Sequence, residues 1–543
     1  YGTTWTTQSQ TLPEFEWVVL DHADGNSMGY GVTTADGHAF VSGSMKSVVR
    51  VENPLTGSAV ETVDQGGDGD VFLAKVSLDG EPTSVWTYAG SSSEIPAHLA
   101  ASTDELFISM TGYFAGNISF GDFSFNNPKD GSTVTHAREL DDGFVVKIAT
   151  ADGAVAWAQH VAADGGASCA GTSFDADGNV VVVGQRCALS SEGEATDCVG
   201  FVALLAADDG ATIWDREFGT AVPSLVDVVA NIDDDKLYIV GRIEGTATID
   251  DLTVSAISAD ASDALLLVLE VSDGTASWAA TVTGDGSGSS SLVEVVDGSV
   301  YMNCLSACET VTSTASSLTA STDGPSINGG VGTGAVVKIN TSGEPTWIAD
   351  TAYSLGMAVT SDAVYVNYYA TGSQTYGDTT FSSWGSWDHY IVKIDAENVA
   401  GEWVMQTGGV GLEYVRRMAG DANGDLYSVG LTQSSPAYFE PLVIDTHLST
   451  DGYDLFLAKL KTSQEVLPAC VTAGSDDGVS VSEGQCFVNN VCYTDGDVSR
   501  NEDAKCLVCS STDSQSTLTL PGGHCFIDGM CYEDGAMRDV SVL

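Results

Sequence analysis

Short apolar runs separated by polar turns recur along most of the chain. No stretch of useful length shows the competing periodicity of a helix. The most regular runs are rich in β-branched and aromatic residues, as in AFVSG at 39, VVVVG at 180 and LYIVG at 237. Asp-Gly turns such as Asp36-Gly37 and Asp152-Gly153 stand between runs. Such turns are typical of antiparallel hairpins, because Gly tolerates positive φ and Asp bonds its own backbone. The pattern predicts a region that is almost all β.

Seven tryptophans mark a repeat within this region. Most of them close one phrase, an apolar strand ending in Lys, a Gly turn and a strand with Trp, as in DVFLAKVSLDGEPTSVW at 70 to 86. Self-similarity at about 40 to 70 residues is typical of propellers. The regular apolar strand also occurs seven times, so we expect seven blades. The repeated residues are Trp17, Trp86, Trp157, Trp214, Trp278, Trp347 and Trp403.

The two ends of this region complement each other. The seventh unit ends in DLFLAKL at 454 to 460 with no Trp strand after it, whereas EFEWVVL at 14 to 20 is a Trp strand without partners. We therefore expect the N-terminal strand to complete the last blade, which leaves no unpaired edge at the seam. Residues 1–464 are predicted to form an all-β, seven-bladed β-propeller.

The long connections are the expected contact regions. Connections between the second and third strands are long and variable, for example 111–140, 187–200 and 306–334, and they share a face with the blade-to-blade connections. Insertions on one face often mark the binding face of a repeat protein. The repeated tryptophans are expected to pack between blades. Trp384 and Trp387 lie on a loop outside the repeat, so they are candidates for stacking a sugar or contacting a neighbouring subunit.

The units resemble the secreted seven-bladed β-propeller repeat family, whose members carry D-x-F-V-x-K, a Gly turn and a Trp strand. The resemblance covers roughly residues 14–462 and implies a surface or secreted module without a shared active site. Leu204 and Val268 replace the lysine of the other units, which disfavours a catalytic role for the lysines. Those lysines are Lys75, Lys147, Lys338, Lys393 and Lys459.

Residues 465–543 follow a different pattern, a cysteine repeat of 39 residues. CFVNNVCYTDGD at 486 and CFIDGMCYEDGA at 525 match in type and spacing, and the second copy is incomplete at Leu543. We expect that the native protein continues or that its last repeat is processed away. Units this small need cross-links. They resemble the C-[FY]-[IV]-x-x-x-C-Y-x-D-G repeats of large extracellular proteins, among them subunits of stramenopile flagellar hairs (mastigonemes). Zinc at Cys506-x-x-Cys509 is the alternative, but it lacks a second close pair.

Charge and cysteine content indicate the compartment. The net charge is -56, from 19 Lys+Arg against 75 Asp+Glu, which disfavours nucleic acid or an anionic membrane as partner. No apolar stretch is long enough to span a bilayer, and a chain that starts at Tyr1 is expected to be a mature product without its signal peptide. Twelve cysteines and glycosylation sequons at Asn117 and Asn340 fit a secreted, extracellular protein.

The cysteines are expected to form a disulfide framework. Cys187 and Cys198 flank one loop, Cys304 and Cys308 could form a small local ring, and Cys169 lacks an obvious mate. Pairing in the tail cannot be deduced from spacing. The full candidate set is Cys169, Cys187, Cys198, Cys304, Cys308, Cys470, Cys486, Cys492, Cys506, Cys509, Cys525 and Cys531.

No motif assigns a catalytic or cofactor-binding residue. Acidic turns at 66–70, 175–179 and 421–425 suggest calcium, but none has the full D-x-D-x-D-G spacing with a distal acid, so hairpin turns explain them better. We expect no cofactor, and weak calcium binding stays open. The histidines show no paired spacing, and no nucleophile elbow or nucleotide loop stands in a fitting context.

Three functional hypotheses follow. The first is a non-enzymatic extracellular structural subunit of a cell-surface or flagellar-hair filament, which binds copies of itself or other extracellular structural proteins. The second is a carbohydrate-binding adhesion propeller with glycans as partners. The third rests on a resemblance of 209–219 and 273–282 to Trp-docking repeats of quinone-dependent dehydrogenases. That resemblance implies eight blades and adjacent cysteines, and this sequence has seven units and no Cys-Cys.

Overall fold

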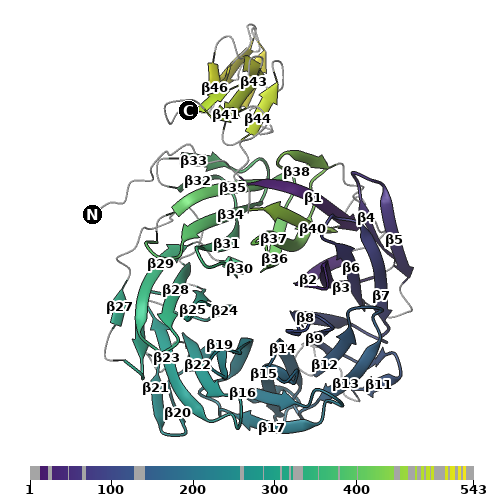
Figure 1. The fold of residues 1–543 in the computed structure, drawn as a ribbon, viewed down its shortest axis with the longest axis vertical. Coiled ribbons are helices and arrows are strands. Elements are labelled where there is room, and N and C mark those ends of the chain that lie inside the picture. Colours follow the sequence, from purple (N-terminus) through teal and green to yellow (C-terminus); the bar gives the residue numbers. More distant parts are fainter. Residues whose placement is uncertain are drawn as a thin grey trace.

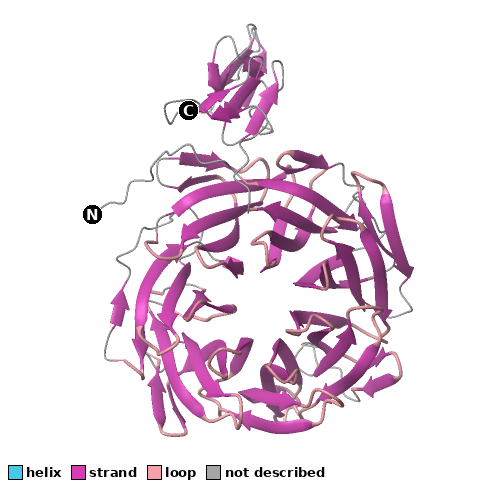
Figure 2. Ribbon diagram, viewed as in Figure 1, coloured by secondary structure: helices cyan, strands magenta, loops and turns pink. Residues whose placement is uncertain are grey.

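A computed structural model describes residues 13–462 with gaps in the connections, and beyond residue 462 it describes only the backbone of short strands. The gaps within the first part are 22–26, 47, 64–68, 128–140, 257–261, 285–286, 306–307, 317–318, 322–333, 352–353, 377–378, 400 and 445–452. All regular structure in the described residues is β, apart from turns (Figure 2). None of these residues belongs to a helix long and apolar enough to cross a membrane.

Seven sheets stand around a central axis like the blades of a propeller (Figure 1). Each blade has four antiparallel strands, with the first strand innermost and the fourth at the rim. This arrangement confirms the predicted fold. Blade 1 comprises β2 (Ser27–Ala35), β3 (His38–Met45), β6 (Asp70–Ser77) and β7 (Pro82–Tyr88). Blade 2 comprises β8 (Glu94–Ala101), β9 (Phe107–Phe114), β12 (Asp142–Ala149) and β13 (Val155–Val161), and blade 3 comprises β14 (Ala167–Phe174), β15 (Val180–Leu189), β16 (Ala195–Leu205) and β17 (Thr212–Glu217).

The remaining blades follow the same order along the chain. Blade 4 comprises β18 (Ser224–Asn231), β19 (Lys236–Glu244), β22 (Ser262–Glu270) and β23 (Ala276–Thr283), and blade 5 comprises β24 (Val293–Val296), β25 (Ser299–Cys304), β28 (Gly334–Asn340) and β29 (Pro345–Thr351). Blade 6 comprises β30 (Ser354–Val359), β31 (Ala363–Ala370), β34 (Asp388–Asp395) and β35 (Gly401–Gly409), and blade 7 comprises β36 (Glu413–Gly420), β37 (Leu426–Thr432), β40 (Asp454–Lys461) and β1 (Glu14–Asp21).

The apolar core lies between neighbouring blades. The middle strands β3 and β6 are buried on both faces, which explains their continuous apolar runs. One core cluster joins Trp17 and Tyr427 of blade 7 to Val41 and Phe72 of blade 1. A blade therefore buries its apolar faces against its two neighbours, and the ring must close for every face to be covered.

The N-terminal strand closes the ring, as expected from the sequence. Strand β1 pairs with β40 in antiparallel register, with Trp17 opposite Lys459 and Leu20 opposite Phe456. The Lys459 ammonium of β40 lies 2.7 Å from the Glu16 carboxylate of β1. Segments from the two ends of the propeller region thus form one blade.

Hairpins inserted between the second and third strands extend the preceding blade at the rim. The blade 1 hairpin β4 (Val48–Asn53) and β5 (Ser58–Val63) pairs with β1 of blade 7. In the same way β26 (Thr310–Ser313) and β27 (Thr319–Ser321) extend β23, and β38 (Ala437–Phe439) and β39 (Leu442–Ile444) extend β35. Two-stranded sheets are formed by β10 (Asn117–Phe120) with β11 (Phe123–Asn126), β20 (Thr246–Ile249) with β21 (Leu252–Ser255), and β32 (Ser373–Tyr376) with β33 (Thr379–Ser382).

Blade 3 departs from this pattern. Its insertion lengthens β15 and β16 within their own sheet, so that Leu189 pairs with Ala195 near the tip. The disulfide between Cys187 and Cys198 joins the two lengthened strands. Blade 3 therefore adds no described strand to the rim of blade 2, whose sheet order ends at β13.

The tail contains four two-stranded hairpins. They pair β41 (Val471–Ala473) with β42 (Val479–Val481), β43 (Gln485–Val488) with β44 (Val491–Thr494), β45 (Val508–Ser510) with β46 (Ser514–Thr519), and β47 (His524–Ile527) with β48 (Met530–Glu533). Cys486 stands opposite Tyr493, and Cys525 stands opposite Tyr532 in the same register. The two copies of the sequence repeat thus form equivalent hairpins, while the predicted tail disulfides lie outside the described side chains.

Candidate interaction surface

The repeated tryptophan and lysine meet at one carbonyl of the next blade. Trp17 Nε1 donates to Leu78 O at 2.9 Å, and Lys459 Nζ donates to the same oxygen at 3.2 Å. Gly80 in this turn has φ +87°, and a Cβ there would lie 2.5 Å from the Trp17 ring. The indole therefore packs directly on the glycine of the turn. This arrangement explains why the repeat needs Gly, Lys and Trp together.

The same contact recurs around the ring. Lys147 and Trp157 both donate to Ala207 O, and Lys338 and Trp347 both donate to Ala396 O. Each of these lysines also lies over an aromatic ring, as Lys338 does over Tyr301 at 5.2 Å. These contacts place the lysines and tryptophans in blade-to-blade docking, which is the role predicted for the tryptophans.

The two tryptophans outside the repeat have different environments. Trp384 is 8% exposed and packs edge-on against Tyr438, whose ring centre is 5.6 Å away. Its side chain therefore offers little surface to a ligand, contrary to what the loop position suggested. Trp387 is half-buried and contacts Tyr369 at 5.3 Å. Of the two candidates, Trp387 is the one with an accessible ring.

Trp387 begins a continuous row of half-buried residues, four aromatic rings and one guanidinium, that we call the aromatic track. It comprises Trp387, Tyr369, Tyr414, Arg416 and Tyr30. The rings of Tyr369 and Tyr414 lie 4.6 Å apart, and the Arg416 guanidinium lies 4.9 Å from Tyr414 and 5.0 Å from Tyr30. The track crosses blades 6, 7 and 1, with Tyr369 near the end of β31 and Tyr414 near the start of β36, the strand ends that adjoin the blade 6 insertion and the blade 6 to blade 7 connection.

Ionisable side chains from four blades meet at the axis. Arg417 Nη1 of β36 lies 3.3 Å from Asp227 Oδ2 of β18, and His98 Nδ1 of β8 lies 3.7 Å from Asp227 Oδ1. Burial lowers the pKa of His98 to about 4. Burial and the nearby Asp227 carboxylate raise the pKa of Glu294 to about 8. The open centre of the ribbon drawing is therefore bridged by side chains of blades far apart in sequence.

Two buried carboxyl groups meet where blades 6 and 7 join. Asp388 and Glu413 are fully buried, and a Cβ on Gly408 would lie 2.9 Å from Asp388 Oδ1 and 2.7 Å from Glu413 Oε2. Gln406 donates to Asp388, and Thr432 donates to Glu413. Burial raises the pKa of Asp388 to about 7, and burial together with Asp388 raises that of Glu413 to about 8. Burial thus favours the protonated forms of both carboxyl groups.

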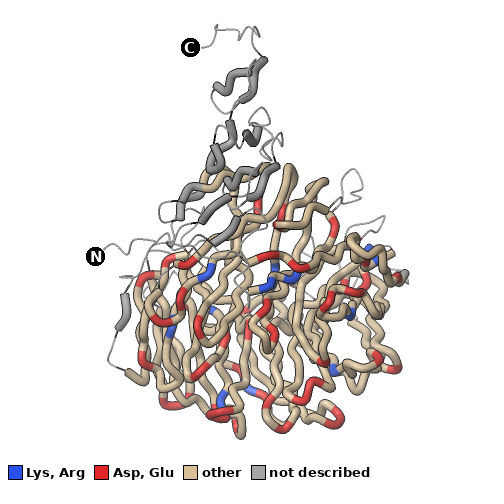
Figure 3. The backbone as a smooth tube through the Cα atoms, turned by 45° about the horizontal axis from the view of Figure 1, so that its top comes forward, with Lys and Arg blue, Asp and Glu red and all other residues tan. Residues whose placement is uncertain are grey.

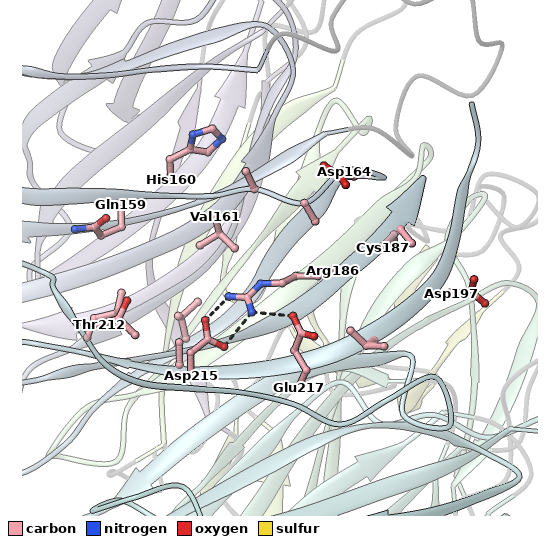
Figure 4. A pocket seen from close by; sticks show the side chains of 17 residues that line it. Gln159, His160, Val161, Asp164, Arg186, Cys187, Asp197, Thr212, Asp215 and Glu217 are labelled. Atoms are coloured by element: carbon pink, nitrogen blue, oxygen red, sulfur yellow. Dashed lines mark hydrogen bonds and ion pairs between the residues drawn. The ribbon is translucent and has the colours of Figure 1, made fainter. Parts of the chain in front are cut away.

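A groove of about 610 Å³ lies between the rims of blades 2 and 3 (Figure 4). Arg186 lies in it and binds both Asp215 oxygens at 2.6 and 2.9 Å and Glu217 at 3.1 Å. Its guanidinium lies 4.1 Å over the Phe201 ring. Asp164 and Asp197 stand exposed at one end of the groove. The cation is thus neutralised within the protein, and the groove keeps an acidic rim.

Two of the three acidic turns considered for calcium use their carboxylates for local hydrogen bonds, and most of the third, 66–70, lies outside the described residues. Asp175 Oδ1 accepts from the backbone of Asp177 at 3.0 Å and Asn179 at 2.8 Å. Asp421 accepts in the same way from Asn423 and Asp425. These contacts are those of hairpin turns. Within the described residues no group of three or more His, Cys, Asp or Glu side chains is placed to hold a metal ion.

The predicted cysteine pairs of the propeller are present, with one correction. Cys187 bonds to Cys198, and Cys304 bonds to Cys308. Cys169 is instead a free, fully buried thiol, and burial raises its pKa above the usual range for cysteine. Its sulfur lies at the blade 2 to blade 3 interface, where a Cβ on Gly143 would approach it to 2.7 Å. No second cysteine of the described residues lies there.

The two sequons differ in accessibility. Asn117 is exposed at the first position of β10. Asn340 is half-buried at the end of β28, where its Oδ1 accepts from Glu344 N at 2.9 Å. Glycosylation of either residue stays a prediction, with Asn117 the more accessible acceptor.

Acidic and basic residues differ in number and in position on the propeller. Acidic residues occupy the loops around the ring, and basic residues are few (Figure 3). Several of those basic residues form ion pairs with acidic residues, such as Lys459 with Glu16 and Arg417 with Asp227. The surface is therefore predominantly acidic, which disfavours the approach of an acidic partner.

Comparison with known proteins supplies no closer assignment. No protein-family model and no curated protein matches the chain. Among solved structures, a quinohemoprotein alcohol dehydrogenase from Comamonas testosteroni aligns at 10% identity and a TM-score of 0.37, covering 82% of this chain and 76% of that one. The quinohemoprotein alcohol dehydrogenase ADHIIG from Pseudomonas putida HK5 aligns at 10% identity and 0.34, covering 85% and 78%. The assignment to seven-bladed propellers accordingly rests on the strand order of this chain itself.

Proposed function

We propose that this protein is an extracellular structural subunit whose propeller makes protein contacts in a cell-surface or flagellar-hair (mastigoneme-like) filament. The observation that carries the proposal is the aromatic track. The repeated tryptophans pack on the turn of the next blade, whereas Trp387, Tyr369 and Tyr414 are half-buried and contact one another. Trp, Tyr and Arg are the residues most enriched at the energetic centres of protein interfaces.

Other features are consistent with this role. The disulfides Cys187–Cys198 and Cys304–Cys308 fit an oxidising compartment. The equivalent hairpins of the tail repeat suit an extended rod. The proposal includes self-association or binding to other extracellular structural proteins, and it includes no catalytic step.

Electron microscopy of the purified full-length chain tests the proposal. We expect regular filaments for the wild type and their loss in a Trp387→Ala/Tyr414→Ala double variant. Leu55→Ala is the matched control, because Leu55 is 52% exposed on the distant β4–β5 hairpin. Dispersed monomers of the wild type under all conditions would contradict a structural role. Quinone absorbance or Ca²⁺-dependent dye reduction would contradict the absence of catalysis.

A carbohydrate-binding adhesion function is the second candidate, and the same track supports it. Exposed faces of Trp and Tyr rings stack on the apolar faces of sugars, and Arg416 supplies donors beside them. A glycan array separates the two candidates. Binding of a defined glycan that is abolished by Trp387→Ala would favour adhesion, whereas an unresponsive array together with filament formation would favour assembly.

A further inference from the structure

The rim of blade 2 lacks the paired hairpin that extends the rims of several other blades. In blades 4, 6 and 7 a hairpin from the following blade pairs with the outermost strand. In blade 1 the hairpin of blade 2 continues the rim, because Ser119 N donates to Ala89 O at 2.8 Å just beyond β7. The corresponding insertion of blade 3 stays in its own sheet. Within the described residues β13 thus pairs only with β12, and one side of its backbone is open.

The sequence of β13 makes this edge unusual. Proteins usually protect edge strands with charged residues or proline. The edge strand β17 carries Asp215, Arg216 and Glu217, and the edge strand β29 begins with Pro345. Strand β13 reads VAWAQHV and contains no Asp, Glu, Lys, Arg or Pro. It therefore has the composition of a strand that receives a further partner.

The groove of about 610 Å³ lies where the missing hairpin would lie. Val161 and Val199, both half-buried, contribute apolar surface to it, and Arg186 is already neutralised by two carboxylates. Asp164 and Asp197 are exposed at its end. An extended, uncharged segment fits this lining, whereas an acidic segment would be repelled.

The chain itself contains such a segment. Residues 1–12 read YGTTWTTQSQTL, with no charged residue in a protein of net charge -56, and seven of the twelve are Thr, Tyr or Trp. These residue types favour strands. Twelve extended residues span about 40 Å, which is more than the seven residues of β13 require. The segment is separated from β1, the fourth strand of blade 7, only by Pro13.

We propose that residues 1–12 of one copy add a strand to β13 in the groove of a second copy. The new backbone hydrogen bonds would satisfy the open edge, and Tyr1 and Trp5 would bury against the apolar lining. Donor and acceptor are different surfaces of the molecule, so the contact is heterologous and can propagate copies into an open chain. This inference rests on the proposed assembly function and names a contact that it would use.

A synthetic peptide with the sequence of residues 1–12 tests the contact directly. The acceptor is the full chain lacking residues 1–12, and binding is measured by fluorescence anisotropy of a labelled peptide. We expect saturable binding that falls at least tenfold in a Val161→Glu variant. Ile213→Glu is the matched control on the charged edge strand β17, where Ile213 is 49% exposed, and it should bind as the parent does. Absence of binding, or equal losses in both variants, overturns the proposal.

Assembly of the complete protein separates this inference from the proposed function. We expect sedimentation of the wild type to show concentration-dependent oligomers, which disappear on deletion of residues 1–12 and in a Thr4→Glu/Thr6→Glu variant. Thermal melting confirms that both remain folded. If the deletion variant still forms filaments that Trp387→Ala/Tyr414→Ala abolishes, the strand-addition contact is wrong and the structural function stands. If a monomeric wild type holds the segment in its own groove, the second-copy contact is wrong.

Discussion

The rims of blades 7 and 2 are built from the same repeat but end differently. In blade 7 the fourth strand β1 pairs with β40, and its last residues Leu20 and Asp21 also pair with β4 of the β4–β5 hairpin. In blade 2 the outermost strand β13 is paired on one side among the described residues and borders a groove. The docking contacts of their tryptophans are equivalent, since Trp17 and Trp157 each donate to a carbonyl of the next blade. The difference arises from the insertions alone.

This comparison separates the scaffold from the variable surface. The Gly, Lys and Trp of the repeat hold adjacent blades together, so their regularity reflects stability. The insertions decide which edges are covered, and the groove lies where blade 3 keeps its insertion in its own sheet. A partner site is therefore expected where the repeat is broken, at the rim of blade 2 and along the aromatic track.

The largest effect is expected from removing the closing strand. Deletion of residues 1–21 removes β1, exposes β40 and uncovers one face of blade 1. Loss of the buried Trp17 side chain alone costs about 3 to 5 kcal/mol, so the deletion should abolish cooperative melting or lower the Tm steeply. Calorimetry measures this. Deletion of residues 1–12 is the control and should leave the Tm of the isolated chain nearly unchanged. Equal melting of the two would contradict the closure.

A smaller loss is expected from filling the glycine contact. Gly80→Ala places a Cβ against the Trp17 ring in a left-handed conformation, which we expect to cost about 2 to 4 kcal/mol in unfolding free energy. Gly57→Ala is the control, because Gly57 has φ +74° and no atom within 4 Å of the added Cβ. It should cost only about 1 kcal/mol, from the backbone conformation. Denaturant titrations that give the same loss for both would show that the Trp docking contributes nothing.

The blade 3 disulfide should contribute less. Replacing Cys187 and Cys198 with Ser removes a cross-link between residues separated by 11 positions, which we expect to cost about 2 to 3 kcal/mol. The matched pair Cys304 and Cys308 is separated by 4 positions and should cost about 1 kcal/mol less. Chemical denaturation of the two double variants tests the order. The reverse order would contradict a loop-closure contribution.

Among these variants, Glu413→Gln is expected to change the unfolding free energy least at neutral pH. The folded-state pKa of Glu413, about 8, lies above its ordinary value of 4.5, so the folded chain retains a proton that the unfolded chain has released. The resulting stability is fully present below pH 4.5 and is lost as the pH rises through 8. We expect the Tm of the wild type to fall between pH 6 and 9, and Glu413→Gln to reduce that fall. Glu397→Gln, at an exposed turn, should leave it unchanged.

The sequence predicts the scaffold well because its determinants are local. A strand, a Gly turn and a Trp strand recur within about 20 residues, and counting these phrases is enough to predict seven blades and the closure by residues 14–20. An Asp at the first position of many third strands, such as Asp388, also recurs in the repeat and can be recognised from the sequence. Its burial beside Glu413 is not, because a neighbouring blade supplies the second carboxyl group.

The candidate surfaces were harder to predict because ring geometry assembles them. Arg417 and Asp227 are 190 residues apart and meet only across the axis. Trp384 is buried by Tyr438, which belongs to the insertion of the following blade. The aromatic track joins blades 6, 7 and 1, the last of which follows the others only through closure. None of these contacts has a short-range sequence signal.

Amide hydrogen exchange tests the central difference between the rims most directly. In the isolated chain lacking residues 1–12, we predict rapid exchange for the outward-facing amides of β13 and slow exchange for the end of β35, where Gly408 and Gly409 pair with β38. Addition of the peptide of residues 1–12 should slow exchange in β13 and leave β35 unchanged. Equal protection of the two strands in the isolated chain, or no change in β13 on addition of the peptide, would contradict the account.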